Sequence, residues 1–179
     1  MFDTLNFAFY NEIPDDDKYI KIYGRQNNKR VSKYIKAKYI KNHESIDKWK
    51  VFIPKANGAS GMITDSGLSR IISTPFIGEP FSGHTQTYIS VGKFDSEEEA
   101  ENCLKYIKTK FARLLLGVLK VTQDNPGPKW KYVPLQDFTN HSDIDWTKSI
   151  SDIDNQLYKK YDLDLQEIKF IEDKIENMD

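Results

Sequence analysis

The sequence of 179 residues has one cysteine, Cys103, and no apolar run of membrane-spanning length. A single cysteine excludes an internal disulfide and any metal site built from several thiolates. A transmembrane helix needs about 18 consecutive apolar residues, and the N-terminal stretch MFDTLNFAFYNEIPDDDK lacks the basic flank and apolar centre of a signal peptide. With 39% hydrophobic and 13% aromatic residues the chain is expected to fold. We expect a cytoplasmic protein with no membrane partner.

Common catalytic and nucleotide-binding signatures are also missing. The sequence has no G-x-x-x-x-G-K-[ST] or G-x-G-x-x-G phosphate loop, no G-x-S-x-G nucleophile elbow and no H-E-x-x-H zinc motif. His43, His84 and His141 are far apart in the sequence and are interpreted as loop residues. Cys103 falls on the apolar side of an expected helix, which favours a small core residue over a nucleophile. We therefore assign no catalytic residue and no metal ligand to this chain.

Acidic residues are scarce in one part of the chain. Residues 18–55 contain twelve Lys or Arg against two acids, a local charge of about +10, although the formal net charge of the protein is −1. The ends compensate, since residues 1–17 hold five acids and no base and residues 137–179 hold twelve acids and five bases. A solvated sheet face explains Lys21, Lys48 and Lys50 but not the near exclusion of acids. The asymmetry favours nucleic-acid binding, because phosphates attract dense cations.

Strand patterns come first along the chain and helix patterns later. KYIKIYGR, WKVFIPK and TQTYISVGKF have the alternation or the β-branched and aromatic content of strands, and QNNK after the first is typical of a turn. Ser96 and Glu99 form a capping-box pattern, and apolar spacing then predicts a helix to about Val121, with a break near Thr109.

Two amphipathic helices are predicted at the end of the chain, the first capped by Ser149 or Ser151. Strands followed by helices predict an α+β fold. We expect a mixed or antiparallel sheet packed on one long helix, with two C-terminal helices.

Three loops carry groups that suit nucleic acid. The QNNK turn with its flanking arginines offers Arg and Asn, which pair with guanine and adenine edges. KANGASG and FSGHTQT are rich in small polar residues, which let the backbone approach phosphates. Each loop taken singly also fits a plain turn. The candidate DNA-binding residues are Arg25, Asn27, Asn28, Lys29, Arg30, Lys33, Lys55, Asn57, Ser60, Ser82, His84, Thr85 and Gln86.

Five segments together resemble a known family. They are YIKIYGR, IDKWKVFIPKANGASG, GEPFSGHTQTYISVGKFDSEEEAENCLKYIKTKFARLLLGVLKVTQ, WKYVPLQDF and SDIDWTKSISDIDNQLYKKYDLDLQEIKFIEDKI. In this order they are similar to the C-terminal target-recognition region of bacterial restriction–modification proteins, the adenine-specific DNA methyltransferases fused to or partnered with endonucleases. The resemblance covers about Lys18 to Met178.

The resemblance implies a module that binds duplex DNA and reads a short site. It divides the chain into an N-terminal extension (1–17), a DNA target-recognition domain (18–140) and a C-terminal helical appendage (141–179). The family's S-adenosylmethionine loop and N-P-P-[YF] motif, which holds a flipped adenine, are absent, and DNPGPKW lacks the second adjacent proline. S-adenosylmethionine and Mg are thus expected only in a separate catalytic domain or subunit, which would be this chain's second partner beside duplex DNA.

Two alternatives remain open at this point. A small metal-dependent nuclease could use the acids of PDDDK, Asp15 to Asp17, together with Lys21, although two-metal chemistry needs carboxylates that converge from different elements. A protein-interaction domain could use the basic face to bind an acidic partner.

Overall fold

A computed structural model of the protein describes residues 2, 6–27, 29–56, 63–64, 67–119 and 127–178. Its elements are β1 (Tyr19–Gln26), β2 (Lys29–Lys36), β3 (Trp49–Pro54), β4 (Phe76–Gly78), β5 (Ser82–His84), β6 (Tyr88–Phe94), α1 (Glu97–Lys108), α2 (Lys110–Val118), α3 (Ile150–Lys160) and α4 (Leu165–Lys174). Short 3-10 helices cover Asn6–Ala8, Ala37–Tyr39 and Gly127–Tyr132. The predicted α+β class is confirmed.

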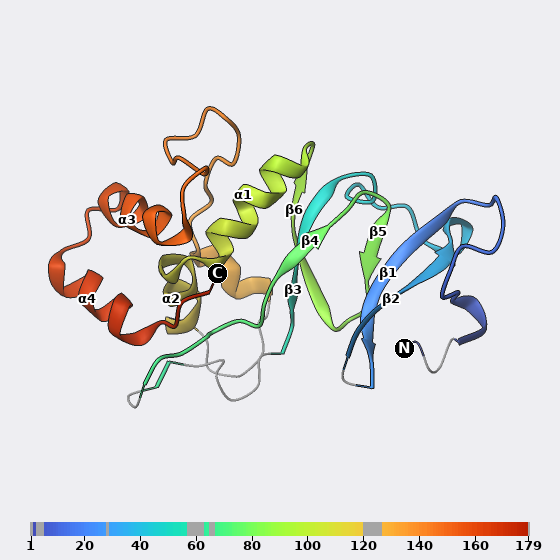
Figure 1. Cartoon of the computed structure of the whole chain (residues 1–179), viewed down its shortest axis with the longest axis horizontal. Coiled ribbons are helices and arrows are strands. Elements are labelled where there is room, and N and C mark those ends of the chain that lie inside the picture. The colour runs from blue at the N-terminus through green and yellow to red at the C-terminus, as the bar shows by residue number, and fades with distance from the viewer. Residues whose placement is uncertain are drawn as a thin grey trace.

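The strands form two three-stranded sheets instead of the single sheet that was expected. In the first sheet β1 lies between β2, its antiparallel hairpin partner, and β5, which runs parallel to it. In the second sheet β3 lies between β4 and β6 and is antiparallel to both. Figure 1 shows the β1–β2 hairpin at one end of the molecule and α3 and α4 at the other.

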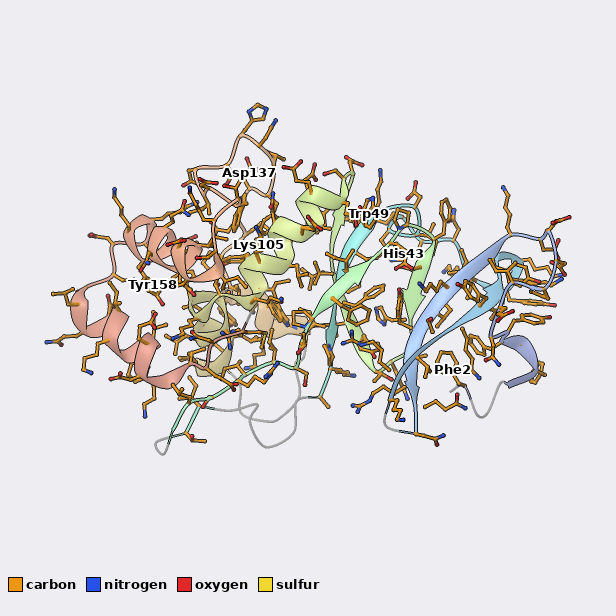
Figure 2. All side chains as sticks on the ribbon, in the orientation of Figure 1. Phe2, His43, Trp49, Lys105, Asp137 and Tyr158 are labelled. Atoms are coloured by element: carbon orange, nitrogen blue, oxygen red, sulfur yellow. The ribbon has the colours of Figure 1, made fainter. Side chains whose placement is uncertain are left out.

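Each sheet has its own apolar core. Ile20, Ile22 and Ile35 of the first sheet pack with Phe2 and Phe9, so residues near the N-terminus belong to this core. Tyr10 extends the pairing of β2 through two backbone hydrogen bonds with Tyr34, each of 2.8 Å. Phe2 lies beside the hairpin in Figure 2, far from Tyr158 on α3.

The second core joins β3 to all four α-helices. Val51 and Ile53 of β3 are fully buried and belong to one cluster with Ile107, Leu157 and Ile171, which come from α1, α3 and α4. The C-terminal helices therefore share the core of the second sheet. Cys103 is 2% exposed within this cluster, as expected for a core residue.

Aromatic rings fill the space between the two sheets. Phe52, on the face of β3 opposite Val51, contacts Tyr23 of β1, Phe76 of β4 and His84 of β5, with ring centroids 5.0 to 5.7 Å apart. Edge contacts of this kind add to the burial of apolar surface. Because the second face of β3 is covered in this way, the strand is buried on both sides.

The long helix predicted after Ser96 is two helices. The Ser96 side chain accepts a hydrogen bond from the Glu99 amide, as the capping-box pattern predicts, and α1 then ends at Lys108. Thr109 leaves the helical conformation, with ψ of 149°, and caps α2 through its side chain. The break near Thr109 was predicted, but the expectation of one long helix packed on the sheet is corrected by it.

No described helix combines the length and the apolar character needed to cross a bilayer.

Candidate nucleic-acid interface

Backbone hydrogen bonds hold three segments together beside the hairpin. The Thr85 amide donates to Tyr23 O of β1 at 2.9 Å, and the Lys55 amide after β3 donates to Thr87 O at 2.9 Å. Gly24 makes this approach possible, since a Cβ there would lie 2.5 Å from the Phe2 ring and 3.0 Å from Thr85. The end of β1, the end of β3 and the β5–β6 loop therefore meet.

Two adjoining hollows lie where these segments meet, and together we call them the cationic hollow. The first, of about 350 Å³, is lined by Arg25, Pro54, Lys55, Ala56, Gln86 and Thr87. The second, of about 240 Å³, is lined by Arg25, Arg30, Pro54, Ser73, Thr74 and Tyr88. None of these lining residues is acidic. Four of the residues predicted from the sequence, Arg25, Arg30, Lys55 and Gln86, come together here.

Two arginines face each other across the hairpin. Arg25 of β1 and Arg30 of β2 are direct partners in the antiparallel register, and both side chains are exposed. The pair therefore places two guanidinium groups, which suit phosphate oxygens, on one exposed surface.

Arg30 is held in place by two neighbours. Its Cζ lies 3.8 Å from the centroid of the Phe76 ring, and its Nη2 donates to Thr74 O at 3.2 Å. Arginine over an aromatic face is held by a cation–π attraction.

The hairpin turn continues this surface outward. Asn27 adopts a left-handed conformation with φ of 50°, as asparagine readily does in tight turns, and its side chain is exposed. Lys29, which begins β2, is exposed as well.

Other predicted residues point inward. Ser82 is 2% exposed and donates to Glu79 O, while Thr85 is 4% exposed and shares a 2.8 Å hydrogen bond with Thr87. His84 is half-buried between aromatic rings, its Nδ1 lies 2.8 Å from Thr85 O, and burial lowers its pKa. Their side chains therefore support the loop from inside and are removed from the candidate surface.

The prediction that Lys33 belongs to the DNA-binding surface is also corrected. It is 8% exposed on the face of β2 opposite Arg30, and its Nζ lies 5.4 Å from the Phe2 ring centroid. The three remaining predicted residues, Asn28, Asn57 and Ser60, lie outside the described residues.

Much of the remaining positive charge of residues 18–55 is neutralised within the fold. Lys21 pairs with Glu79 at 2.7 Å, Lys48 pairs with Asp95 at 2.6 Å, and Lys36 pairs with both Asp15 and Asp17. The local charge of about +10 therefore overstates what is open to a ligand.

The buried Lys50 makes no ion pair with any described residue. It is 2% exposed, and its ammonium donates to Ser45 O at 2.7 Å and Ser82 O at 3.0 Å. Burial lowers the pKa of Lys50 from 10.5 to about 8. Three backbone carbonyls surround its ammonium, and one of them, Ser82 O, belongs to β5 of the other sheet. We therefore interpret Lys50 as a structural residue that links the two sheets.

The residues named for the nuclease alternative have different partners in the described part of the chain. Asp15 and Asp17 engage Lys36, whereas Lys21 engages Glu79, so the predicted acids and lysine do not converge. Across the described ranges no three His, Cys, Asp or Glu side chains are grouped so as to hold a metal ion.

Comparison with known proteins gives no match. No family model, curated protein or solved structure matches this chain. The resemblance to target-recognition regions therefore stays a prediction from the sequence.

Reasoning from the sequence missed part of the hollow. Ser73, Thr74 and Tyr88 line it, and Phe76 supports Arg30. Nothing in the sequence placed this segment beside the hairpin.

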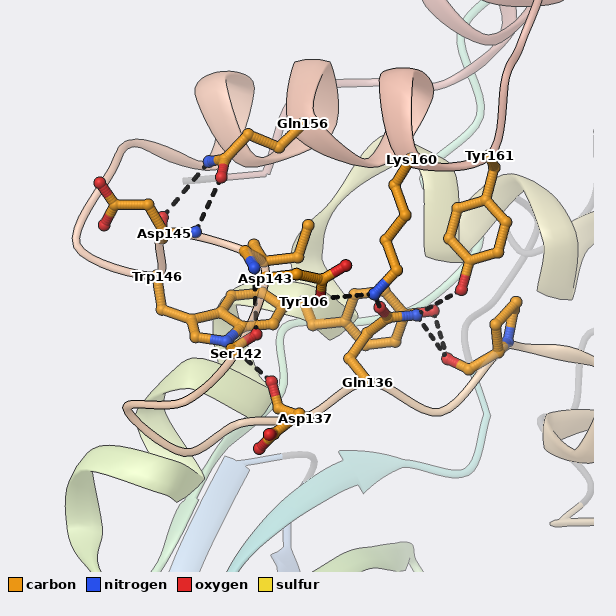
Figure 3. A network of polar contacts seen from close by, with 12 residues as sticks. Tyr106, Gln136, Asp137, Ser142, Asp143, Asp145, Trp146, Gln156, Lys160 and Tyr161 are labelled. Carbon is orange, nitrogen blue, oxygen red and sulfur yellow. Dashed lines mark hydrogen bonds and ion pairs between the residues drawn. The ribbon is translucent and has the colours of Figure 1, made fainter.

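The acidic end of the chain carries a separate polar network, shown in Figure 3. Lys160 donates to Gln136 at 2.9 Å and Asp143 at 2.7 Å, and Gln136 donates to the Tyr161 hydroxyl at 2.8 Å. Trp146 Nε1 donates to Asp137 O at 2.9 Å. Because these groups satisfy one another, we interpret the network as structural, fixing residues 134–147 against α3.

Proposed function

We propose that this chain binds duplex DNA through the cationic hollow and the hairpin turn, as the target-recognition part of a restriction–modification enzyme. One observation carries the proposal. Cations from three separate segments, Arg25, Arg30 and Lys55, surround hollows whose described lining contains no acid. The sequence resemblance supplies the enzyme class, and catalysis, with S-adenosylmethionine and Mg, is assigned to a partner domain or subunit.

The charge distribution supports binding of DNA at the hairpin end of the molecule. Residues 137–179, which hold twelve acids and five bases, include α3 and α4. These helices lie at the end of the molecule opposite β1 and β2 (Figure 1), so they do not cover the cationic hollow. Phosphates would be attracted to the hairpin end and repelled from the helical end. A two-stranded ribbon fits the major groove of B-DNA. The β1–β2 hairpin is two-stranded beyond Tyr23, where the pairing of β1 with β5 ends.

The test is the binding of a fluorescent mixed-sequence duplex at several salt concentrations. We expect the Arg25→Gln/Lys55→Gln variant to bind less tightly, with a salt slope flatter by about 1 for each phosphate that the variant no longer neutralises. The matched control is Lys131→Gln/Lys159→Gln, which removes two exposed lysines that do not line the cationic hollow. Equal weakening in the two variants, or salt-insensitive binding by the wild type, contradicts the proposal.

The same assay separates the alternatives. If the natural partner is an acidic protein, polyglutamate should displace the labelled duplex as effectively as unlabelled DNA does. We expect unlabelled DNA to displace it and polyglutamate not to. A nuclease should nick DNA with magnesium and lose this activity in Asp15→Ala, and we expect no nicking.

A further inference from the structure

We propose that Arg30 reads a guanine in the DNA site, while Arg25 and Lys55 hold phosphates. This inference rests on the proposed function and names the base class that the same surface recognises. It starts from the difference between two arginines that are direct partners in one hairpin.

The guanidinium of Arg30 is fixed before any ligand binds. Its Cζ lies 3.8 Å from the centroid of the Phe76 ring, and Thr74 O accepts from Nη2 at 3.2 Å, so two different groups restrain its position. Phe76 is itself held by ring contacts with Tyr23 and Tyr88, with centroids 5.1 and 5.3 Å apart. A side chain held in this way loses little further rotamer freedom on binding.

The charge and most donors of Arg30 are still available. Among the described residues it has no carboxylate partner, and Thr74 O accepts from only one of the five N–H groups of a guanidinium. The planar fork of arginine matches O6 and N7 of guanine in the major groove, which is the commonest specific contact of protein with DNA. Lysine has the same charge but cannot reproduce the fork.

Phosphate contacts make different demands. They need charge near the backbone but no fixed plane, and they carry no sequence information. Lys55, which directly follows β3, is exposed and meets this requirement. Arg25, on the strand paired with that of Arg30, lines both hollows. The two roles therefore fall on different residues of one surface.

The test begins by selecting preferred duplexes for the wild type from a randomised library. Binding of the best duplex is then compared for Arg30→Lys and for the matched control Arg25→Lys. We expect Arg30→Lys to lose about tenfold affinity for the preferred duplex and less than about twofold for a scrambled one, because a bidentate pair discriminates by about 5- to 150-fold. Arg25→Lys should leave the preference intact.

A second readout distinguishes base reading from a structural role. Replacing the preferred guanine by 7-deazaguanine removes the N7 acceptor and keeps Watson–Crick pairing. We expect this change to weaken binding of the wild type but not of Arg30→Lys, whose thermal unfolding should match the wild type. Equal weakening in both proteins overturns the inference.

Failure of the inference and failure of the proposed function give different results. Wild-type binding without sequence preference, or an unchanged preference in Arg30→Lys, overturns the guanine-reading role and leaves DNA binding in place. No binding of any duplex by the wild type overturns both.

Discussion

At the scale of single residues, Lys50 has a buried ammonium group that is stabilised by hydrogen bonds to backbone carbonyls. Its position in the alternation of β3 suggested a solvated face, yet it is 2% exposed. Burying an ammonium group costs free energy unless hydrogen bonds compensate, and here the backbone carbonyls of Ser45 and Ser82 accept from it. The pKa of Lys50 falls to about 8 because of this burial.

The lowered pKa of Lys50 has a defined effect on stability. Between pH 8 and 10.5 the unfolded chain binds more protons than the native protein, so raising the pH stabilises the fold. Lys50→Met cannot titrate. We expect the free energy of unfolding of the wild type to increase relative to Lys50→Met by up to about 3 kcal/mol across this window.

Urea unfolding at about pH 7.5 and about pH 10.5 brackets this window and measures the difference between the two proteins. A difference that does not change with pH would contradict the burial of a charged Lys50.

Cys103 offers a second test at this scale. It is 2% exposed, and burial raises the pKa of its thiol. A buried thiol reacts only when the protein opens. We expect a disulfide reagent to modify Cys103 at the rate of unfolding, faster as urea is added. Rapid modification of the native protein would show that the helix face carrying Cys103 is not packed as described.

At the scale of elements, the start of α2 depends on a residue of α3. Asp154 is 4% exposed, and its carboxylate accepts from the amides of Lys110 and Phe111 at 3.0 and 2.9 Å. These amides have no partner within α2, and an anion near a helix N-terminus is stabilising. Burial nevertheless raises the pKa of Asp154 to about 6.

Replacement of Asp154 should therefore be costly. We expect Asp154→Ala to lower the free energy of unfolding by about 2 kcal/mol or more, because two buried N–H groups lose their acceptor. Asp154→Asn retains one neutral acceptor and should lose less. Denaturant unfolding of the three proteins gives this order, and an Asp154→Ala variant as stable as the wild type would refute the capping role.

Local signals predicted several elements well. Ser96 with Glu99 and the break at Thr109 were visible because capping depends on residues close in sequence. For α3 the sequence offered Ser149 or Ser151, and Ser149 is the cap. The 3-10 helix Gly127–Tyr132, in contrast, has no capping signal of this kind in the sequence. The hydroxyl of Tyr106 in α1 donates to Pro134 O just after it, a contact between segments far apart in the chain.

At the scale of the whole molecule, the separation of charge was visible in the sequence but its use was not. Composition placed the positive charge in residues 18–55, yet ion pairs between distant segments, such as Lys21 with Glu79, determine which cations stay open. The parallel pairing of β1 with β5, which buries Ser82, was equally invisible because it joins strands far apart in the chain. The candidate surface is therefore smaller than the sequence suggested.

The most direct test of the central claim is amide hydrogen exchange of the intact chain with and without duplex DNA. Our account predicts slower exchange at residues 25–30, 55–56 and 85–88 when DNA is bound, and no change in α3 or α4. Protection confined to α3 and α4, or no protection anywhere at low salt, would contradict it.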